Sequence, residues 1–217
     1  MKTYTTILFD LDGTLTDPGE GITNAVAYAL RHYDISVADR RQLYPFIGPP
    51  LHDSFMKFYG FSAAQAEAAI VLFREYYHDT GIWENVVYPG IAETLHKLCD
   101  GGKRLLVATS KPEEFAIRIL DKFELSGYFD SICGATFDNT RVTKAQVIAH
   151  ALRQGQITDI SACIMVGDRE HDVLGAKEFG MDALGVLYGY GDADELLQSG
   201  ARYTAKTPAE IAALLCR

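Results

Sequence analysis

The sequence has few cysteines, no long hydrophobic run and no excess of positive charge, and each absence narrows the class of protein. Its 217 residues include four cysteines, with no C-x-x-C pair and no histidine at zinc-site spacing. No apolar run approaches the ~20 residues that a membrane-spanning helix requires. The first residues lack the apolar core, about 7–15 residues long, of a secretory signal. These absences predict a reduced, cytoplasmic protein with no membrane partner.

The charge balance is acidic, with 29 Asp and Glu against 20 Lys and Arg and a net charge of −9. This balance argues against nucleic acid or an anionic membrane as the main partner. A phosphate-bearing substrate stays open, because a bound metal ion can reverse the local field in a site. The hydrophobic content of 48% is ordinary for a globular protein and sufficient for a core.

Alternating apolar strands and helical patterns dominate the chain from about residue 84 onward. We expect strands at residues 5–9, 105–109, 129–133, 162–166 and 183–187, and helices that begin near residues 112, 143, 171 and 208. Strands that are apolar throughout, without polar alternation, indicate a parallel sheet covered on both faces. The sequence therefore predicts an α/β fold with a Rossmann-like parallel sheet.

Residues 17–82 have a different composition, rich in Ala, Tyr, Phe and Leu at helical spacing and without a strong strand candidate. This segment predicts an all-helical insert. The expected domains are a core formed by residues 1–16 and 84–217 and an insert formed by residues 17–83. An insert that leaves the core near the first strand is well placed to act as a lid.

The first predicted strand leads into two carboxylates, Asp10 and Asp12. Residues two apart on an extended chain point to the same side, so these like charges need a compensating partner. A hard cation such as Mg²⁺, which prefers oxygen ligands, is the usual partner. Gly13 permits a tight turn after them, and Thr14 offers a hydroxyl and a backbone N–H to an oxyanion.

An EF-hand calcium loop also begins with Asp-x-Asp, but the later positions exclude it here. Thr14 stands where Asp or Asn is expected, Leu15 where Gly is expected, and Gly21 where the bidentate Glu belongs.

Residues 10–15, DLDGTL, resemble the first signature motif of the haloacid dehalogenase superfamily of phosphohydrolases. The resemblance implies an α/β core with an inserted helical cap. It extends over essentially the whole chain, because three further segments match the remaining motifs in the expected order.

The second segment is Thr109-Ser110-Lys111, at the end of a predicted strand. Ligands of open parallel sheets bind at the carboxyl ends of strands, where a hydroxyl can contact a phosphoryl oxygen. Ser110 could instead cap the helix that begins at Pro112, leaving Thr109 to face the ligand. The segment resembles the second motif.

The third segment opens a helix at Lys144. A lysine near a helix N-terminus is unfavourable unless an anion is nearby. An ordinary solvated lysine is the alternative, and Arg141 and Lys111 compete for the same role. In the family interpretation, Lys144 neutralises phosphoryl oxygens and the crowded carboxylates.

The fourth segment, residues 166–172, reads VGDREHD. A buried strand ends at Asp168, and Asp172 follows near the start of a helix. Helix capping could explain Asp172 but not Asp168 as well. The resemblance implies that Asp168 ligates Mg²⁺ directly and that Asp172 acts through water or orients the ligands.

The resemblance implies hydrolysis of a phosphate monoester through an aspartyl-phosphate, with a small phosphorylated metabolite as substrate. Asp10 is the expected nucleophile and Asp12 the general acid and base. The metal set comprises Asp10, Asp12 through its backbone carbonyl, Asp168 and Asp172. Thr109, Ser110, Lys144, Gly13 and Thr14 are the expected contacts of the phosphoryl group.

Local runs such as Tyr88-Pro89-Gly90 resemble the phosphoglycolate-phosphatase-like branch, and phosphoglycolate or a nucleoside monophosphate is the expected kind of substrate. His52 and Lys57 of the insert are candidates for substrate selection, although a packing role for His52 and an ordinary surface role for Lys57 are the favoured alternatives. Three alternatives stay open: a phosphomutase, a pyrophosphatase, and a catalytically silent phosphate-binding regulatory protein. A dehalogenase would not need Asp12.

Overall fold

The computed structural model describes residues 2–138 and 140–216, which divide into two compact units. Of the described residues, 2–16, 87–138 and 140–216 form the first unit and 17–86 form the second. The sequence placed the second boundary at residues 83–84, three residues earlier. The two segments where the chain passes between the units pair as short strands, β2 (Thr16–Asp17) and β3 (Val86–Val87).

The described part of the first unit contains a six-stranded sheet, parallel throughout, in the order β5-β4-β1-β6-β7-β8. The strands are β1 (Thr6–Phe9), β4 (Arg104–Pro112), β5 (Ser131–Ala135), β6 (Cys163–Gly167), β7 (Asp182–Val186) and β8 (Tyr203–Ala205). The α/β fold class predicted from the sequence is confirmed.

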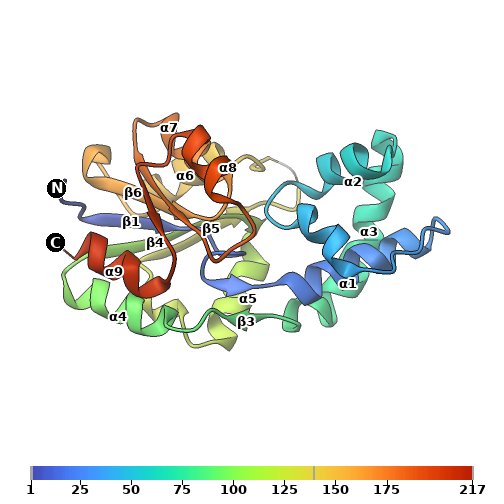
Figure 1. Cartoon of the computed structure of the whole chain (residues 1–217), viewed down its shortest axis with the longest axis horizontal. Coiled ribbons are helices and arrows are strands. Elements are labelled where there is room, and N and C mark those ends of the chain that lie inside the picture. Colours follow the sequence, from blue (N-terminus) through green and yellow to red (C-terminus); the bar gives the residue numbers. More distant parts are fainter. Residues whose placement is uncertain (1, 139, 217) are drawn as a thin grey trace. The chain divides into compact units, whose positions relative to one another are not determined.

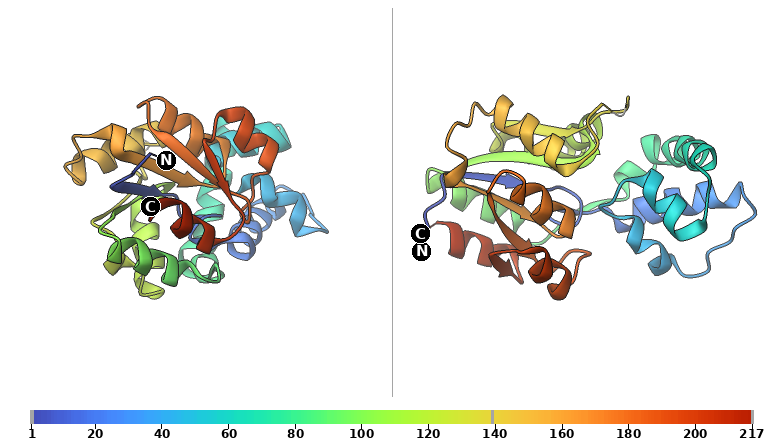
Figure 2. Two further views of the ribbon diagram at one scale, coloured as in Figure 1. Left: turned by 60° about the vertical axis from the view of Figure 1, so that its left-hand side comes forward. Right: turned by 90° about the horizontal axis from the view of Figure 1, so that it is seen from above.

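Helices cover both faces of this sheet (Figure 1; Figure 2). One face packs against α6 (Lys144–Gln154), α7 (Glu170–Lys177) and α8 (Ala193–Ser199), and the other against α4 (Ile91–Asp100), α5 (Glu113–Lys122) and α9 (Pro208–Leu215). Successive side chains along each central strand therefore point alternately to two buried faces of the sheet. Leu8, Leu106 and Met165 belong to the core cluster under α6 and α7, whereas their neighbours along each strand, also buried, point the other way.

The sequence explains where two of these helices begin. Thr143 caps α6 by accepting a hydrogen bond from the Gln146 amide, and Gln146 reciprocates. Thr207 caps α9, with Pro208 in the first turn. The predicted starts near residues 143 and 208 are therefore confirmed.

Two local expectations are wrong. Strand β4 does not end at Thr109 but continues to Pro112, with an irregularity in its pairing after Ala108. Ser110 does not cap α5, because it lies within the strand and Pro112 occupies the N-cap position without a side-chain hydrogen bond.

The second unit is built from α1 (Gly19–Arg31), the 3-10 helix η1 (Arg40–Phe46), α2 (Leu51–Tyr59), α3 (Ala63–Asp79) and the 3-10 helix η2 (Gly81–Trp83). Its core is aromatic: the ring of Phe55 lies 5.0 Å from that of Phe46 and 5.7 Å from that of Phe61. Among the described residues, no helix combines the length and apolar character that crossing a membrane demands.

Candidate active site

Four carboxylates and two lysines gather at the carboxyl ends of the central strands of the first unit. Asp10 directly follows β1, and Asp168 directly follows β6. Because parallel strands end at the same edge of the sheet, the loops after them converge. All six side chains are at least nine-tenths buried; they belong to Asp10, Asp12, Lys111, Lys144, Asp168 and Asp172.

Lys144 lies between two of the carboxylates. Its Nζ is 2.9 Å from Asp10 Oδ1 and 2.7 Å from Asp172 Oδ1, and it also donates to the Ala108 carbonyl at 3.1 Å. Burial alone would lower the pKa of Lys144, but the charges of Asp10 and Asp172 outweigh burial and raise the pKa above its ordinary value. The solvated-lysine alternative is therefore excluded, and the ammonium stays charged.

Lys111 forms a second buried ion pair, in which its ammonium donates to Asp12 Oδ2. Burial raises the pKa of the Asp12 carboxyl above its ordinary value, although the positive charge of Lys111 opposes this effect. From the sequence, Lys111 was only a competitor of Lys144. The structure places both lysines in the cluster, each beside a different carboxylate.

The loop after β1 forms a tight turn in which the Gly13 amide donates to the Thr16 carbonyl at 2.8 Å. Gly13 has φ +82°, and a Cβ there would overlap the Asp168 carboxylate. Only glycine therefore fits at this point. The Thr14 hydroxyl next to it is fully buried and has no hydrogen-bond partner among the described residues.

The two acidic residues after β6 are held by backbone amides. Tyr190 N donates to Asp168 Oδ2 at 2.7 Å, and Arg169 N donates to Asp172 Oδ2 at 3.1 Å. Asp172 thus helps to cap the start of α7 while its other oxygen faces Lys144. The contact from Tyr190 was not predicted from the sequence. Tyr190 stands between Gly189 and Gly191, where the backbone passes close to Gly13 and Asp168.

The hydroxyl of Thr109 is buried and accepts a hydrogen bond from the Lys111 amide at 3.2 Å. Ser110, the next residue, is half-buried in β4. His52 and Lys57 belong to α2 of the second unit, where their contacts are local. His52 Nδ1 lies 3.4 Å from Asp53, and Lys57 lies over the ring of Phe58.

The carboxylate cluster matches the requirements of a hard divalent cation. One carboxylate oxygen from each of Asp10, Asp168 and Asp172 lies within 4.8 Å of the others. Asp168 Oδ1 is buried without a hydrogen bond among the described residues. Burial and the neighbouring Asp172 and Asp10 raise the pKa of Asp168 well above its ordinary value. Such a shift means that too little positive charge lies near these carboxylates to stabilise their ionised form.

The summed charge of the six groups also favours a divalent cation in this cluster. Four carboxylates face two ammonium groups, an excess of two negative charges when all are ionised. A single dication balances that excess, and oxygen-only donors suit Mg²⁺ rather than softer metals. The Asp12 carboxylate lies outside this group of three and pairs with Lys111, and the metal ligation expected of the Asp12 backbone carbonyl stays a prediction.

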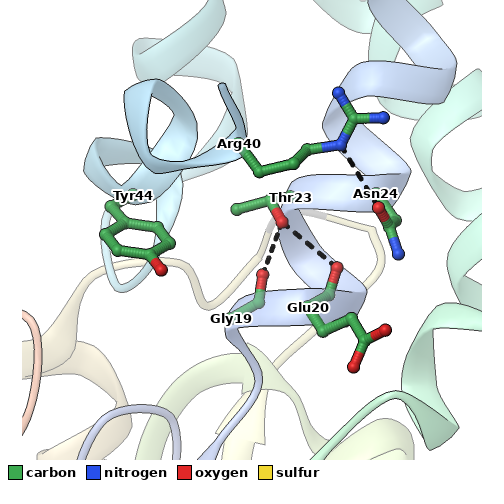
Figure 3. A pocket seen from close by; sticks show the side chains of 6 residues that line it. All are labelled: Gly19, Glu20, Thr23, Asn24, Arg40 and Tyr44. Carbon is green, nitrogen blue, oxygen red and sulfur yellow. Dashed lines mark hydrogen bonds between the residues drawn. The ribbon is translucent and has the colours of Figure 1, made fainter. Parts of the chain in front are cut away.

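The second unit has a pocket of its own, with a volume of about 330 Å³ (Figure 3). Asn24 and Arg40 meet on its wall, where Arg40 Nε donates to Asn24 Oδ1 at 3.3 Å. Thr23 turns its hydroxyl to the Gly19 carbonyl at 2.7 Å. The lining is completed by Glu20 and Tyr44. It therefore offers one cation, one anion and an aromatic ring to a ligand.

A parallel α/β sheet that gathers carboxylates and lysines at its carboxyl edge is suited to binding a metal ion and an anionic ligand, and comparison with known proteins names the family. The chain belongs to the haloacid dehalogenase-like hydrolases, whose family model matches residues 7–186. The resemblance seen in the sequence is therefore confirmed.

Individual relatives refine this assignment. A 5'-nucleotidase of Pseudomonas aeruginosa is 47% identical over 193 residues, which cover 89% of this chain and 87% of that protein. The tyrosine-protein kinase PtkA of Mycobacterium tuberculosis is 42% identical over 87% of this chain, but the match spans only 64% of PtkA. The crystal structure of a predicted phosphatase from Clostridium acetobutylicum superposes with a TM-score of 0.95 at 44% identity and covers 98% of both chains. The chain is accordingly an enzyme of the phosphatase type within this family.

Proposed function

We propose that the protein is a Mg²⁺-dependent phosphatase that hydrolyses a small phosphomonoester through an aspartyl-phosphate on Asp10. The observation that carries the proposal is the buried group of Asp10, Asp168, Asp172 and Lys144, in which one lysine contacts two of three clustered carboxylates. The 47% identity to a 5'-nucleotidase favours nucleoside monophosphates as substrates, and phosphoglycolate is the other expected class.

Asp10, Asp168 and Asp172 would hold the Mg²⁺ ion. When bound, the ion supplies positive charge that draws the substrate phosphate to Asp10 and stabilises charge on its oxygens. Lys144 would hold the Asp10 carboxylate in one orientation and add its own charge to the same oxygens. The turn at Gly13 and the buried hydroxyls of Thr14 and Thr109 are the expected neutral donors.

Asp10 attacks phosphorus with a carboxylate oxygen, and the bond between phosphorus and the leaving oxygen breaks. Asp12 gives its proton to that leaving oxygen, then takes a proton from the water that hydrolyses the aspartyl-phosphate. This double role requires a carboxyl group that holds a proton near neutral pH. Burial moves the pKa of Asp12 in that direction.

The test is phosphate release from 2-phosphoglycolate, nucleoside monophosphates, sugar phosphates and pyrophosphate, with Mg²⁺ present. We expect wild-type protein to release phosphate, Asp10→Asn to lose at least ~10³-fold in rate, and EDTA to abolish release until Mg²⁺ is restored. Circular dichroism of Asp10→Asn checks that the fold is intact. Turnover by a folded Asp10→Asn protein at a rate near that of wild type would contradict the assignment.

The second candidate function is transfer of the phosphoryl group to an acceptor other than water, because a protein kinase is among the similar proteins. A mutase would share the same first step. Mass spectrometry of the products distinguishes these reactions, since a phosphatase converts all the substrate phosphate to inorganic phosphate.

A further inference from the structure

A second group of metal-ligating side chains lies away from the carboxylate cluster, at the edge of the sheet formed by β5. It consists of Glu113 at the start of α5, Cys133 on β5 and His150 on α6. One ligand atom from each residue lies within 4.8 Å of the others. Their positions are 20 and 17 residues apart in the sequence, so no spacing rule could have grouped them.

We propose that Glu113, Cys133 and His150 form a binding site for Zn²⁺ or a similar borderline-soft divalent cation. Thiolate sulfur, imidazole nitrogen and carboxylate oxygen are the three side-chain ligands that zinc takes in proteins. Mg²⁺ avoids sulfur and nitrogen donors, so this site and the carboxylate cluster select different metals. Three protein ligands leave a fourth, open position for water.

The three ligand atoms lie within 4.8 Å of one another, which is near the spacing that a tetrahedral site requires. Ligands about 2.0–2.3 Å from a zinc ion lie roughly 3.3–3.8 Å from one another. His150 Nε2 is already 3.8 Å from Glu113 Oε2. Cys133 is buried, whereas the side chains of His150 and Glu113 are 18% and 34% exposed, which gives an ion a path from solvent. Glu113, the most exposed of the three, would have to shift against its hydrogen bonds from Gly134 and Arg141 to close the remaining distance.

The carboxylate of Glu113 is already oriented by other groups. Gly134 N donates to its Oε2 at 3.1 Å, and Arg141 Nη2 donates to the same atom at 2.9 Å. Arg141 is itself fixed by donating from Nε to the Gly134 carbonyl at 2.6 Å. Such supporting bonds are typical of carboxylate ligands, and a carboxylate keeps further lone pairs for a metal. Because Gly134 and Arg141 both donate to Oε2, the metal would be bound through Oε1, and the charge of Arg141 weakens binding.

The Cys133 thiol loses its proton to solvent as sulfur bonds to the metal, and no electron is transferred. The thiolate and the Glu113 carboxylate supply two negative charges to the dication, although the Glu113 carboxylate also pairs with Arg141. The bound ion would tie α5 and α6 to the edge strand β5, so it should raise the thermal stability of the first unit.

The test is titration of the full-length protein with Co²⁺, as a coloured substitute for Zn²⁺, in the presence of excess Mg²⁺ to fill the carboxylate cluster. Wild type is expected to develop a thiolate-to-cobalt absorption band that Zn²⁺ removes by competition. Cys133→Ser is expected to lose the band. Cys163→Ser, which replaces an equally buried cysteine on β6, is the matched control and should keep it.

A second variant keeps the test decisive if Cys133→Ser does not fold. His150→Ala removes a partly exposed ligand and should weaken Co²⁺ and Zn²⁺ binding at least ~10-fold, with a smaller zinc-dependent rise in melting temperature. Absence of the band in wild type, a band that survives Cys133→Ser, or unchanged affinity in folded His150→Ala would each overturn the proposal.

Discussion

Asp10 and Asp12 are two residues apart, yet each contacts a different lysine, and this difference separates their expected chemistry. Lys144 contacts Asp10, whereas Lys111 contacts Asp12. The carboxylates were predictable from the sequence because acids rarely follow a buried strand directly. The pairing of Lys111 was not predictable, because it depends on β4 continuing past Thr109 to bring that side chain to the cluster.

Replacing Lys111 tests whether the proton chemistry of Asp12 depends on this contact. Lys111→Met keeps most of the apolar stem and removes the charge beside Asp12. We expect the phosphatase rate to fall about 10²-fold, the lower range for loss of general acid–base assistance. The measurement is kcat at saturating substrate and Mg²⁺.

Lys122→Met is the control for this change, because Lys122 is an exposed lysine at the end of α5. It should leave kcat within twofold of wild type. If Lys111→Met also stays within twofold, Lys111 plays no part in the reaction.

At the scale of elements, the close approach of α7 to α6 positions Lys144. Gly175 on α7 faces the base of the Lys144 side chain, and a Cβ at Gly175 would lie 2.8 Å from Lys144 Cγ and 3.0 Å from Lys144 Cβ. These atoms are near the backbone, so they cannot simply swing away. The glycine therefore permits the helix packing on which the ion pairs of Lys144 depend.

Gly175→Ala should accordingly displace Lys144 while leaving the sheet intact. We expect destabilisation of about 1–3 kcal/mol from overpacking and a fall in kcat of roughly 10-fold or more. Urea unfolding and steady-state kinetics measure the two effects. Gly127→Ala, where a Cβ would meet nothing within 4 Å, is the matched control. Equal activity of the two variants would show that this packing does not position Lys144.

Most of the sheet could be predicted from the sequence, because its central strands are apolar runs that end in polar residues. Strand β8 and helix α8 could not. Strand β8 has only three residues, lies at the sheet edge, and includes the half-buried Tyr203 and Thr204, so it lacks the apolar pattern of a central strand. Helix α8 has seven residues and buries only Leu196, which leaves too little hydrophobic periodicity to detect.

At the scale of the whole molecule, two compact units follow from one change in composition along the chain. The aromatic and alanine-rich texture of residues 17–86 produces a helical unit with its own core. Its pocket could not be predicted, since Asn24 and Arg40 come from separate helices. The candidates named from the sequence, His52 and Lys57, do not line that pocket and stay predictions.

We expect the second unit to influence which phosphomonoester is hydrolysed. Arg40→Ala removes the cation of its pocket and should change the ratio of kcat/KM between a nucleoside monophosphate and 2-phosphoglycolate at least ~5-fold, about 1 kcal/mol. Arg31→Ala is the control, because Arg31 is an exposed arginine of the same unit. If the ratio is the same in wild type and both variants, the pocket does not contribute to substrate specificity.

Detection of the covalent intermediate is the most direct test of the aspartyl-phosphate mechanism. Asp12→Asn protein is mixed with Mg²⁺ and p-nitrophenyl phosphate, whose leaving group needs no proton from Asp12, then quenched in acid and analysed by intact and peptide mass spectrometry. Loss of the Asp12 carboxylate should slow hydrolysis of the intermediate, so we expect one added phosphoryl group on Asp10. The adduct should be absent from protein that also carries Asp10→Asn. A phosphoryl group on another residue, or phosphate release by Asp12→Asn with no adduct at any time, would contradict the proposed reaction.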